Sequence, residues 1–201
     1  MMAKTKTDPA ICDAHIILAP LDVCYAEGLF AHLNDWDVVR MLSEVPWPLR
    51  YEDVETFLSS EHPTTDDFVI LANLDAQVGE ALDREVFHPI GVCGVKRPGS
   101  SEPPRRMPRL GYWIGRPHWG QGFGTEAVAE LVDRAFRMYP HDRVGAGVFK
   151  ENASSQRVLA KLGFTAKGSK MVTSRSRGCE VETVDMQVTR AEWEAAKARR
   201  Q

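Results

Sequence analysis

The sequence predicts one α/β (α+β) domain, a mixed, mostly antiparallel sheet with helices on both faces. First, residues 109–149 run strand, glycine-rich loop, helix, strand, which makes one right-handed crossover between parallel strands. Second, residues 68–74 and 90–95 are dense in apolar and β-branched side chains, as central antiparallel strands are. Third, 201 residues with 43% hydrophobic content suit one ordinary core.

The N-terminal half predicts strands and helices in turn. Residues 1–10 are polar and are expected to be loose, with the single domain spanning 11–201. The elements expected next are a strand at 14–19, a helix from Leu21 to Leu33 with Asp22 as its cap, a short helix at 36–42, a helix at 51–61, and the strands at 68–74 and 90–95.

The C-terminal half completes a sheet of about seven strands. Its expected elements are a strand at 110–114, a helix from Gly124, a strand at 143–149, a helix after Asn152 that ends at Gly163, a short strand to about 170, a polar loop at 174–178, a strand at 180–188 and a final helix capped by Thr189.

Composition excludes several classes of function. The net charge of −3, with both signs interspersed, gives no basic field for nucleic acid. The four cysteines and six histidines show no metal-ligand spacing, so no metal is expected. The start has no apolar signal core, and no run approaches the ~20 apolar residues of a membrane helix. We therefore expect a cytoplasmic enzyme with reduced thiols and no membrane partner.

Three glycines lie between the 110–114 strand and the following helix, in the run W-G-Q-G-F-G-T at 119–125. Glycine lets a main chain approach a ligand closely, and the first N–H groups of a helix attract anions. The loop thus predicts a phosphate or pyrophosphate site, or else glycines that only turn the chain. Gly120, Gly122 and Gly124 match neither a P-loop nor the G-x-G-x-x-G pattern.

A second motif follows the 143–149 strand, N-A-S-S-Q-R-V-L-A-K-L-G-F at 152–164. Together, W-G-Q-G-F-G-T-E-A and this motif resemble the GCN5-related N-acetyltransferases (GNAT superfamily), and within them the ribosomal-protein N-terminal acetyltransferase (RimJ/RimL-like) branch. The resemblance also extends to residues 45–48 and 182–193. It implies a GNAT fold in which the two central parallel strands splay apart and acyl-coenzyme A lies in the opening.

The resemblance implies a role for each residue of the first motif. Main-chain amides of the loop would hold the coenzyme's pyrophosphate, from Gly120, Gln121, Gly122, Phe123, Gly124 and Thr125. The backbone of Tyr112, Trp113 and Ile114 would pair with the pantetheine arm, and the amide near Ile114 would polarise the thioester carbonyl.

In the second motif, the resemblance implies that Asn152 hydrogen-bonds to the coenzyme, and Asn152 is also the expected cap of its helix. Ser155 stands where the branch has a serine that protonates the leaving thiolate; the alternative is a hydroxyl satisfying the first helical turn. Leu159 replaces the tyrosine that donates this proton elsewhere in the family. Lys150 and Arg157 are candidates for the 3′-phosphate, although both residue types usually lie on solvated surface.

The general base is not evident. Arg109 stands where related enzymes often carry Glu, and Glu80, Glu85, Glu182 and Asp185 are fallback candidates. A lysine amine with a pKa of ~10.4 loses its proton at pH 7 at a cost of about 4–5 kcal/mol, against ~1.4 kcal/mol for an α-amine near 8. The missing Glu therefore favours an α-amine or a small-molecule amine deprotonated through water.

The leading hypothesis is transfer of an acetyl group from acetyl-CoA to a primary amine by direct attack in a ternary complex. Alternatives are a succinyl or other short acyl donor, with Arg109 as its carboxylate partner, or a non-catalytic acyl-CoA sensor. Trp36 and Trp47 are candidates for contact with the acceptor, or for loop anchors. The family makes a homodimer possible, although no residue pattern indicates one.

Overall fold

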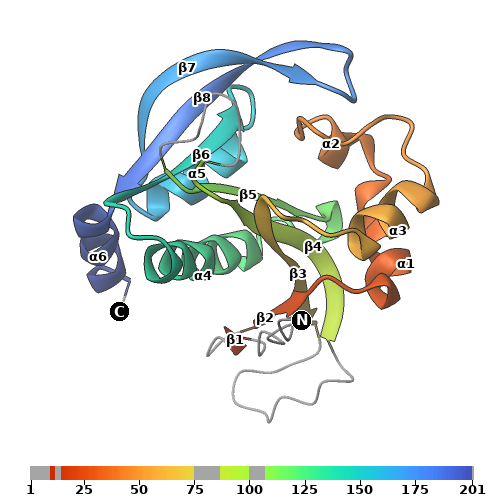
Figure 1. Ribbon diagram of the computed structural model, residues 1–201, viewed down its shortest axis with the longest axis horizontal. Coiled ribbons are helices and arrows are strands. Elements are labelled where there is room, and N and C mark those ends of the chain that lie inside the picture. Colours follow the sequence, from red (N-terminus) through yellow and green to blue (C-terminus); the bar gives the residue numbers. More distant parts are fainter. Residues whose placement is uncertain (1–9, 12–14, 75–86, 100–106, 201) are drawn as a thin grey trace.

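The computed structural model describes residues 10–11, 15–74, 87–99 and 107–200. The N-terminal segment predicted to be loose, up to residue 9, lies outside this part of the chain. So do the candidate bases Glu80 and Glu85. The described residues form one sheet with helices packed on it (Figure 1).

The strands are β1 (Ala10–Ile11), β2 (Ile16–Pro20), β3 (Thr65–Asn73), β4 (Phe87–Lys96), β5 (Arg109–Ile114), β6 (Arg143–Phe149), β7 (Thr165–Ser174) and β8 (Cys179–Thr189). The helices are α1 (Ala26–Leu33), α2 (Trp36–Val39), α3 (Tyr51–Ser59), α4 (Phe123–Met138), α5 (Ala153–Lys161) and α6 (Arg190–Ala198), with short 3-10 turns η1 (Val23–Tyr25) and η3 (Arg116–His118).

The sheet has the order β1-β2-β3-β4-β5-β6-β8-β7. Every neighbouring pair is antiparallel except β5 and β6, which are parallel and joined through α4. The seven predicted strands are present, and the two-residue β1 adds an edge strand beside β2. The prediction of a mixed, mostly antiparallel sheet with a βαβ crossover is confirmed.

Helices cover both faces of the sheet because successive strand residues point to opposite sides. On β2, Ile16 and Leu18 pack with α4, α5 and α6 in one buried cluster. Ile17 and Ala19 join α1, α2 and α3 in a second cluster on the other face. Figure 1 shows these helix groups on opposite sides of the central strands.

The helix α4 is the main support of the first cluster. Its apolar side chains recur at helical spacing, and Val128, Leu131 and Val132 are completely buried. Full burial of such a side chain stabilises the fold by about 1.5–3 kcal/mol. The strands on which α4 packs are therefore held firmly at its N-terminal end, where the glycine loop lies.

The C-terminal segment differs from the prediction in one respect. Thr189 caps α6 as expected, in a capping box with Glu192. The strand predicted to end near 170 instead continues to Ser174, which pairs with Cys179. Nearly all of β7 is exposed on both faces, so its sequence lacks an apolar alternation, and only pairing with β8 reveals its length.

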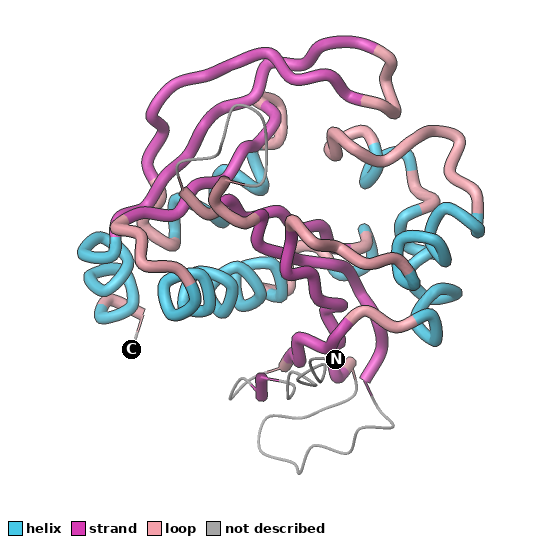
Figure 2. The backbone as a smooth tube through the Cα atoms, viewed as in Figure 1, coloured by secondary structure: helices cyan, strands magenta, loops and turns pink. Residues whose placement is uncertain are grey.

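The β7–β8 hairpin arches over the sheet and approaches the loop after α2 (Figure 2). Its turn is fixed there, since the Arg175 N–H donates to the Ser43 carbonyl at 2.9 Å and the Arg177 Nε to the Arg40 carbonyl at 2.8 Å. In the part of the chain that the structure describes, no helix is long and apolar enough to span a bilayer.

Candidate active site

The glycine loop brings the end of β5 to the start of α4. Gly122 is the residue before the helix, has φ +95°, and offers no side chain as a cap. Its carbonyl accepts the N–H groups of Thr125 and Glu126. The N–H groups of Phe123 and Gly124, first in the helix, have no acceptor within the described residues. These donors and the helix dipole make the predicted anion site available.

The backbone requires a glycine at two of the three positions and not at the third. Gly120 and Gly122 have φ +78° and +95°, in the left-handed region that side chains other than glycine rarely adopt. Gly124 has neither a positive φ nor a crowded position, because a Cβ there would lie 3.6 Å from the Tyr112 ring and 3.8 Å from the Ile114 side chain. The fold of the chain alone does not demand a glycine at 124.

Three side chains hold the loop in place. The Trp119 indole donates to the Ile114 carbonyl at 2.7 Å, and the Gln121 amide donates to the Pro117 carbonyl at 2.9 Å. Phe123 is buried among the apolar residues of α4 and the sheet. The loop is thus fixed against both elements it connects, before any ligand arrives.

The parallel strands β5 and β6 separate next to this loop. They are paired only through Arg109 with Gly145 and Leu110 with Ala146. The residues 111–114 of β5 and 147–149 of β6 continue without pairing to each other. The splayed central strands that the family resemblance implies are therefore present.

The pairing of β5 with β4 decides which main-chain groups face this opening. The Gly115 N–H donates to the Ile90 carbonyl at 2.8 Å, so alternate residues of β5, including Trp113, direct their main chain to β4. Tyr112 and Ile114 direct theirs away from β4, as the bond from Trp119 to the Ile114 carbonyl confirms. Of the three residues predicted to pair with a ligand, only these two have suitably directed main chains.

The N-terminus of α5 borders the opening from the side of β6. The Asn152 side chain accepts the Ser155 N–H at 3.0 Å, so its predicted role as cap is confirmed. Lys150 forms an exposed ion pair with Glu182 at 2.7 Å, and Arg157 donates to the Ser154 hydroxyl at 3.0 Å. Lys150 also holds the pKa of Glu182 below its usual range, which makes this fallback base a poor one.

The structure also places the Tyr112 side chain beside Ser155. Burial raises the pKa of the Tyr112 phenol, and the Ser155 hydroxyl offsets part of that effect. The two hydroxyls interact without reaching the geometry of a full hydrogen bond, and the Tyr112 oxygen is buried with no other partner in the described structure. Sequence reasoning assigned only the backbone of Tyr112.

Arg109 takes part in a charge pair on the opposite face of the sheet. Its guanidinium lies 2.6 Å from the Asp185 carboxylate, whose other oxygen accepts the Gln187 amide at 2.7 Å. The side chain crosses β6 over two glycines: a Cβ at Gly145 would lie 3.0 Å from the guanidinium, and one at Gly147 3.5 Å. Arg109 is thus already paired with a carboxylate.

Two aromatic pairs lie on the side of α1–α3. The His32 and His118 rings meet edge to face with their Nε2 atoms 3.3 Å apart, and His32 lies on Gly115, where a Cβ would be 2.6 Å from its ring. Burial lowers the pKa of both histidines. Trp36 and Trp47 lie side by side with ring centroids 5.5 Å apart, and they are 42% and 39% exposed.

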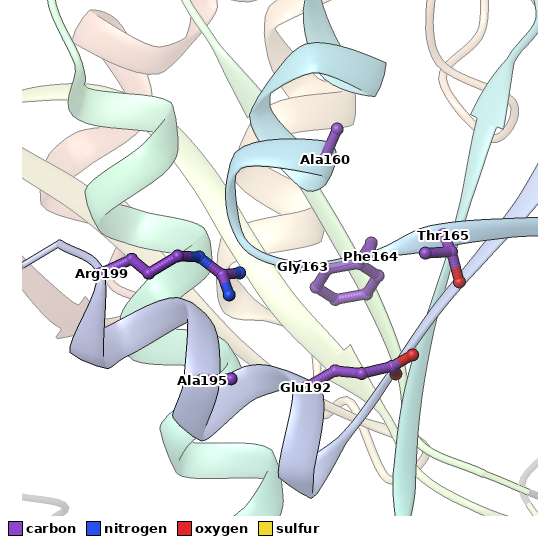
Figure 3. A pocket seen from close by; sticks show the side chains of 7 residues that line it. All are labelled: Ala160, Gly163, Phe164, Thr165, Glu192, Ala195 and Arg199. Carbon is purple, nitrogen blue, oxygen red and sulfur yellow. The ribbon is translucent and has the colours of Figure 1, made fainter.

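A pocket of about 300 Å³ between the end of α5 and α6 contains none of the predicted site residues (Figure 3). It is shallow, and its Glu192 is already engaged in capping α6. The functional candidate is therefore the opening between β5 and β6. Across the described residues, no three His, Cys, Asp or Glu side chains are arranged to bind a metal ion.

The structure therefore groups most predicted residues at one opening. The glycine loop and the main chains of Tyr112 and Ile114 lie on one side of it, and Asn152 and Ser155 on the other. Sequence reasoning missed the Tyr112 hydroxyl and the His32–His118 pair. Neither had a signal, because each joins residues that are far apart in the sequence.

Comparison with known proteins agrees with this geometry. Residues 15–165 match the model of the acetyltransferase (GNAT) domain family. The chain is 28% identical over 156 residues to the uncharacterized N-acetyltransferase p20 of Bacillus licheniformis, which covers 74% of this chain and 85% of that protein.

Two solved structures share the fold at low identity. One is the ribosomal-protein-S5-alanine acetyltransferase of Vibrio fischeri, with a TM-score of 0.68 and 17% identity over 92% of this chain and 98% of that one. The other is the spermidine N-acetyltransferase of Vibrio cholerae in complex with CoA and spermine, with a TM-score of 0.68 and 15% identity over 90% and 98%. The family match covers most of the chain, and the protein belongs to the GNAT acetyltransferases.

Proposed function

We propose that this acyltransferase moves an acetyl group from acetyl-CoA to a primary amine, by direct attack of the amine within a ternary complex. The observation that carries the proposal is the position of the Phe123 and Gly124 N–H groups, which have no acceptor among the described residues, at the mouth of the opening between β5 and β6. Such donors suit the diphosphate of a coenzyme. The same opening leads toward the main chains of Tyr112 and Ile114.

The coenzyme is assigned to residues on both sides of the opening. Main-chain amides of the loop bind the diphosphate, with contributions from Gly120, Gln121, Gly122, Phe123, Gly124 and Thr125. Tyr112 and Ile114 offer main-chain groups to the pantetheine amides, as a partial extra strand would. The side-chain N–H groups of Asn152 are assigned to the same ligand.

The chemistry needs an oxyanion donor and a proton for the leaving sulfur. The Ile114 N–H, directed into the opening, is placed to donate to the oxygen that becomes negative as the amine attacks. Ser155 is assigned the hydroxyl that protonates the leaving sulfur. No covalent acyl-enzyme is invoked, because no described cysteine lies on an element that borders the opening. Cys24 lies in η1 and Cys179 begins β8 at the hairpin turn. Cys93 is buried on β4, where burial strongly raises the pKa of its thiol.

The acceptor is an amine that needs little help to lose its proton. Arg109 stands in the position of the missing Glu and is paired with Asp185, so neither group is a free base. An α-amine costs about 3 kcal/mol less to deprotonate at pH 7 than a lysine side chain. Two solved neighbours are named for a ribosomal-protein alanine and for spermidine, so a protein N-terminus and a small amine both belong in the test.

Arg109 does not favour the alternative of a succinyl donor. That idea required a free cation for the second carboxylate, and the Arg109 guanidinium already contacts Asp185 at 2.6 Å. Titration calorimetry with acetyl-CoA, succinyl-CoA and CoA tests this directly. We expect acetyl-CoA and CoA to bind with similar affinity, because the shared diphosphate supplies most of the contacts.

Thiol release tests the acceptor class. We expect acetyl-CoA turnover with peptides whose α-amine is free, or with small amines whose pKa is similarly low. Spermidine, whose alkyl amines are as basic as lysine, is included as the small amine for which a solved neighbour is named. Blocking the α-amine of a lysine-containing peptide is expected to abolish turnover. Equal rates on the blocked peptide would overturn the α-amine preference, and tight acetyl-CoA binding with no turnover on any amine would favour a sensor over an enzyme.

A further inference from the structure

The phenol of Tyr112 has no structural use that the fold explains. Its ring packs against the core cluster on the side of α4, and its oxygen is buried without a full hydrogen bond in the described part of the chain. Leaving a buried hydroxyl without a hydrogen bond destabilises the fold, and phenylalanine would fill the same space without that cost. A buried polar group left in this state requires a functional or structural explanation.

The groups around the Tyr112 phenol indicate a functional role for it. The Ser155 hydroxyl is the one group whose interaction with the phenol is resolved in the described structure. Ser155 is itself held in the first turn of α5, where its N–H donates to the Asn152 side chain. The Tyr112 ring also lies 3.6 Å from the point that a Cβ of Gly124 would occupy, so it passes beneath the glycine loop.

The direction of proton movement follows from burial. A low-dielectric environment disfavours the phenolate, and burial accordingly raises the pKa of Tyr112. The phenol is therefore protonated at neutral pH and can donate a hydrogen bond to Ser155. Because the phenolate is costly in this environment, the phenol proton moves only together with the transfer from Ser155 and is then replaced from water. Ser155 alone is a weak acid, and a second hydroxyl behind it allows a proton to be replaced as the first is given up.

We propose that Tyr112 and Ser155 form a two-hydroxyl proton relay, in which the Tyr112 phenol donates to Ser155 and Ser155 donates to the sulfur that leaves the thioester. This inference rests on the proposed acetyl transfer and adds to it a positioning residue on β5. The strand thereby supplies the phenol that α5 lacks, because Leu159 is fully buried and has no polar group.

In the proposed acetyl transfer, each bond that forms is matched by one that breaks. The amine lone pair forms the C–N bond, and collapse of the tetrahedral intermediate breaks the C–S bond with its electron pair remaining on sulfur. The sulfur takes the Ser155 hydroxyl proton, and Ser155 takes the Tyr112 proton. The proton lost by the amine nitrogen goes to water, and water in the emptied opening restores the phenol through Ser155. The products are the N-acetyl amine and CoA with a free thiol.

The test compares Tyr112→Phe with Tyr139→Phe, which removes a hydroxyl at the end of α4 that donates to Asp66. With the best acceptor of the amine panel, Tyr112→Phe is expected to lower kcat about 10- to 100-fold. Acetyl-CoA affinity by calorimetry should stay within twofold, and the melting temperature should not fall. Tyr139→Phe should leave kcat unchanged.

Ser155 variants show whether the two hydroxyls act together. Ser155→Ala is expected to lower kcat at least as much, Ser155→Thr to restore it, and the double variant Tyr112→Phe/Ser155→Ala to be no worse than Ser155→Ala alone, since the relay acts as a unit. Independent, multiplying losses would overturn the relay. An unchanged kcat in Tyr112→Phe would overturn it while leaving acetyl transfer intact, whereas a wild-type protein that acetylates no amine would remove both.

Discussion

Gly124 occupies the second position of α4 with an ordinary backbone and no crowded neighbour. Alanine there gains up to about 1 kcal/mol in helix propensity, so Gly124→Ala is expected to leave the melting temperature unchanged or raise it. The added methyl lies where the coenzyme's diphosphate is proposed to approach. We expect the acetyl-CoA dissociation constant to rise roughly tenfold, equivalent to ~1.4 kcal/mol, when measured by calorimetry.

The control for this change is Gly111→Ala. Gly111 lies on β5, and a Cβ there would meet nothing within 4 Å. Because its main chain is directed to β4 rather than to the opening, acetyl-CoA affinity should not change in this variant. If Gly124→Ala also binds acetyl-CoA normally, the diphosphate does not lie on the first turn of α4.

The His32–His118 pair predicts a dependence of stability on pH. Burial lowers the pKa of each ring below its ordinary value near 6.5, and for His118 the charges of His32 and His88 act in the same direction. Below pH 6.5 the unfolded chain therefore binds more protons than the folded chain, and stability is lost as the pH falls. The melting temperature should decrease between pH 7.5 and 5.5.

Replacing one ring should weaken this response. In His118→Gln the decrease between the same two pH values is expected to be smaller than in wild type, because one depressed histidine is gone and the other loses a charged neighbour. His141→Gln serves as a matched control outside the pair. A wild-type decrease that survives unaltered in His118→Gln would show that other groups cause it.

At the scale of residues, the sequence predicts contacts between near neighbours along the chain and misses contacts between residues on different elements. The caps at Asn152 and Thr189 follow from short-range rules, since each side chain accepts an N–H three residues ahead. The Tyr112–Ser155 contact and the histidine pair each join residues on different elements. No periodicity or spacing encodes such contacts, because they depend on which strands pair and at what register.

At the scale of elements, β5, β6 and β8 are joined by one partly buried charge pair. The side chains of Arg109 and Asp185 are only 16% and 24% exposed. Arg109→Leu leaves the carboxylate with only Gln187 as a partner, and we expect a loss of about 2–3 kcal/mol in the free energy of unfolding. Urea denaturation measures this loss.

A double-mutant cycle separates the interaction energy of the Arg109–Asp185 pair from the packing energy of its two side chains. Asp185→Leu alone leaves the guanidinium unpaired and is expected to cost a similar amount. Arg109→Leu combined with Asp185→Leu should recover much of the stability, because no unpaired charge remains. Losses that simply add in the double variant would mean that the two groups contribute independently.

The same strands show how far element boundaries can be predicted. The bounds of β6 match the prediction because most of its residues are buried and apolar. Glycine weakens a strand interior, and the path of Arg109 over Gly145 and Gly147 explains why two glycines lie in this one. The length of β7 was underestimated, since both faces are exposed and its strand character comes from β8.

At the scale of the whole molecule, the hairpin joins the two helical groups across the open side of the sheet. The hairpin turn contacts residues 39–44, mostly through main-chain carbonyls of that segment. Its contacting residues are Ser174, Arg175, Ser176 and Arg177. The fold class was predictable from the order of strands and helices. This closure was not, because a polar turn at 174–178 gives no sign of its docking partner.

Arg177 is the side chain that ties this closure to the site. Only 18% exposed, it donates to the Arg40 carbonyl, pairs with Glu151 next to the cap of α5, and lies 5.4 Å above the Phe149 ring. The hydrogen bond from Arg177, aided by its charge, also holds the pKa of Glu151 below the usual range. Arg177→Ala should free the hairpin turn without disturbing α4 or the glycine loop.

Hydrogen exchange and kinetics together test whether Arg177 holds the hairpin turn. In Arg177→Ala the Arg175 amide, bonded to Ser43, is expected to exchange on the order of tenfold faster, while amides between β6 and β8 keep their protection. The KM for the acceptor should change and the acetyl-CoA affinity should not, because the turn covers the face opposite α4.

The control variant is Arg143→Ala, which removes a guanidinium paired only with its neighbour Asp142 among the described residues. It should change neither the acceptor KM nor the acetyl-CoA affinity. Unaltered Arg175 exchange in Arg177→Ala would mean that main-chain bonds alone hold the turn against residues 39–44.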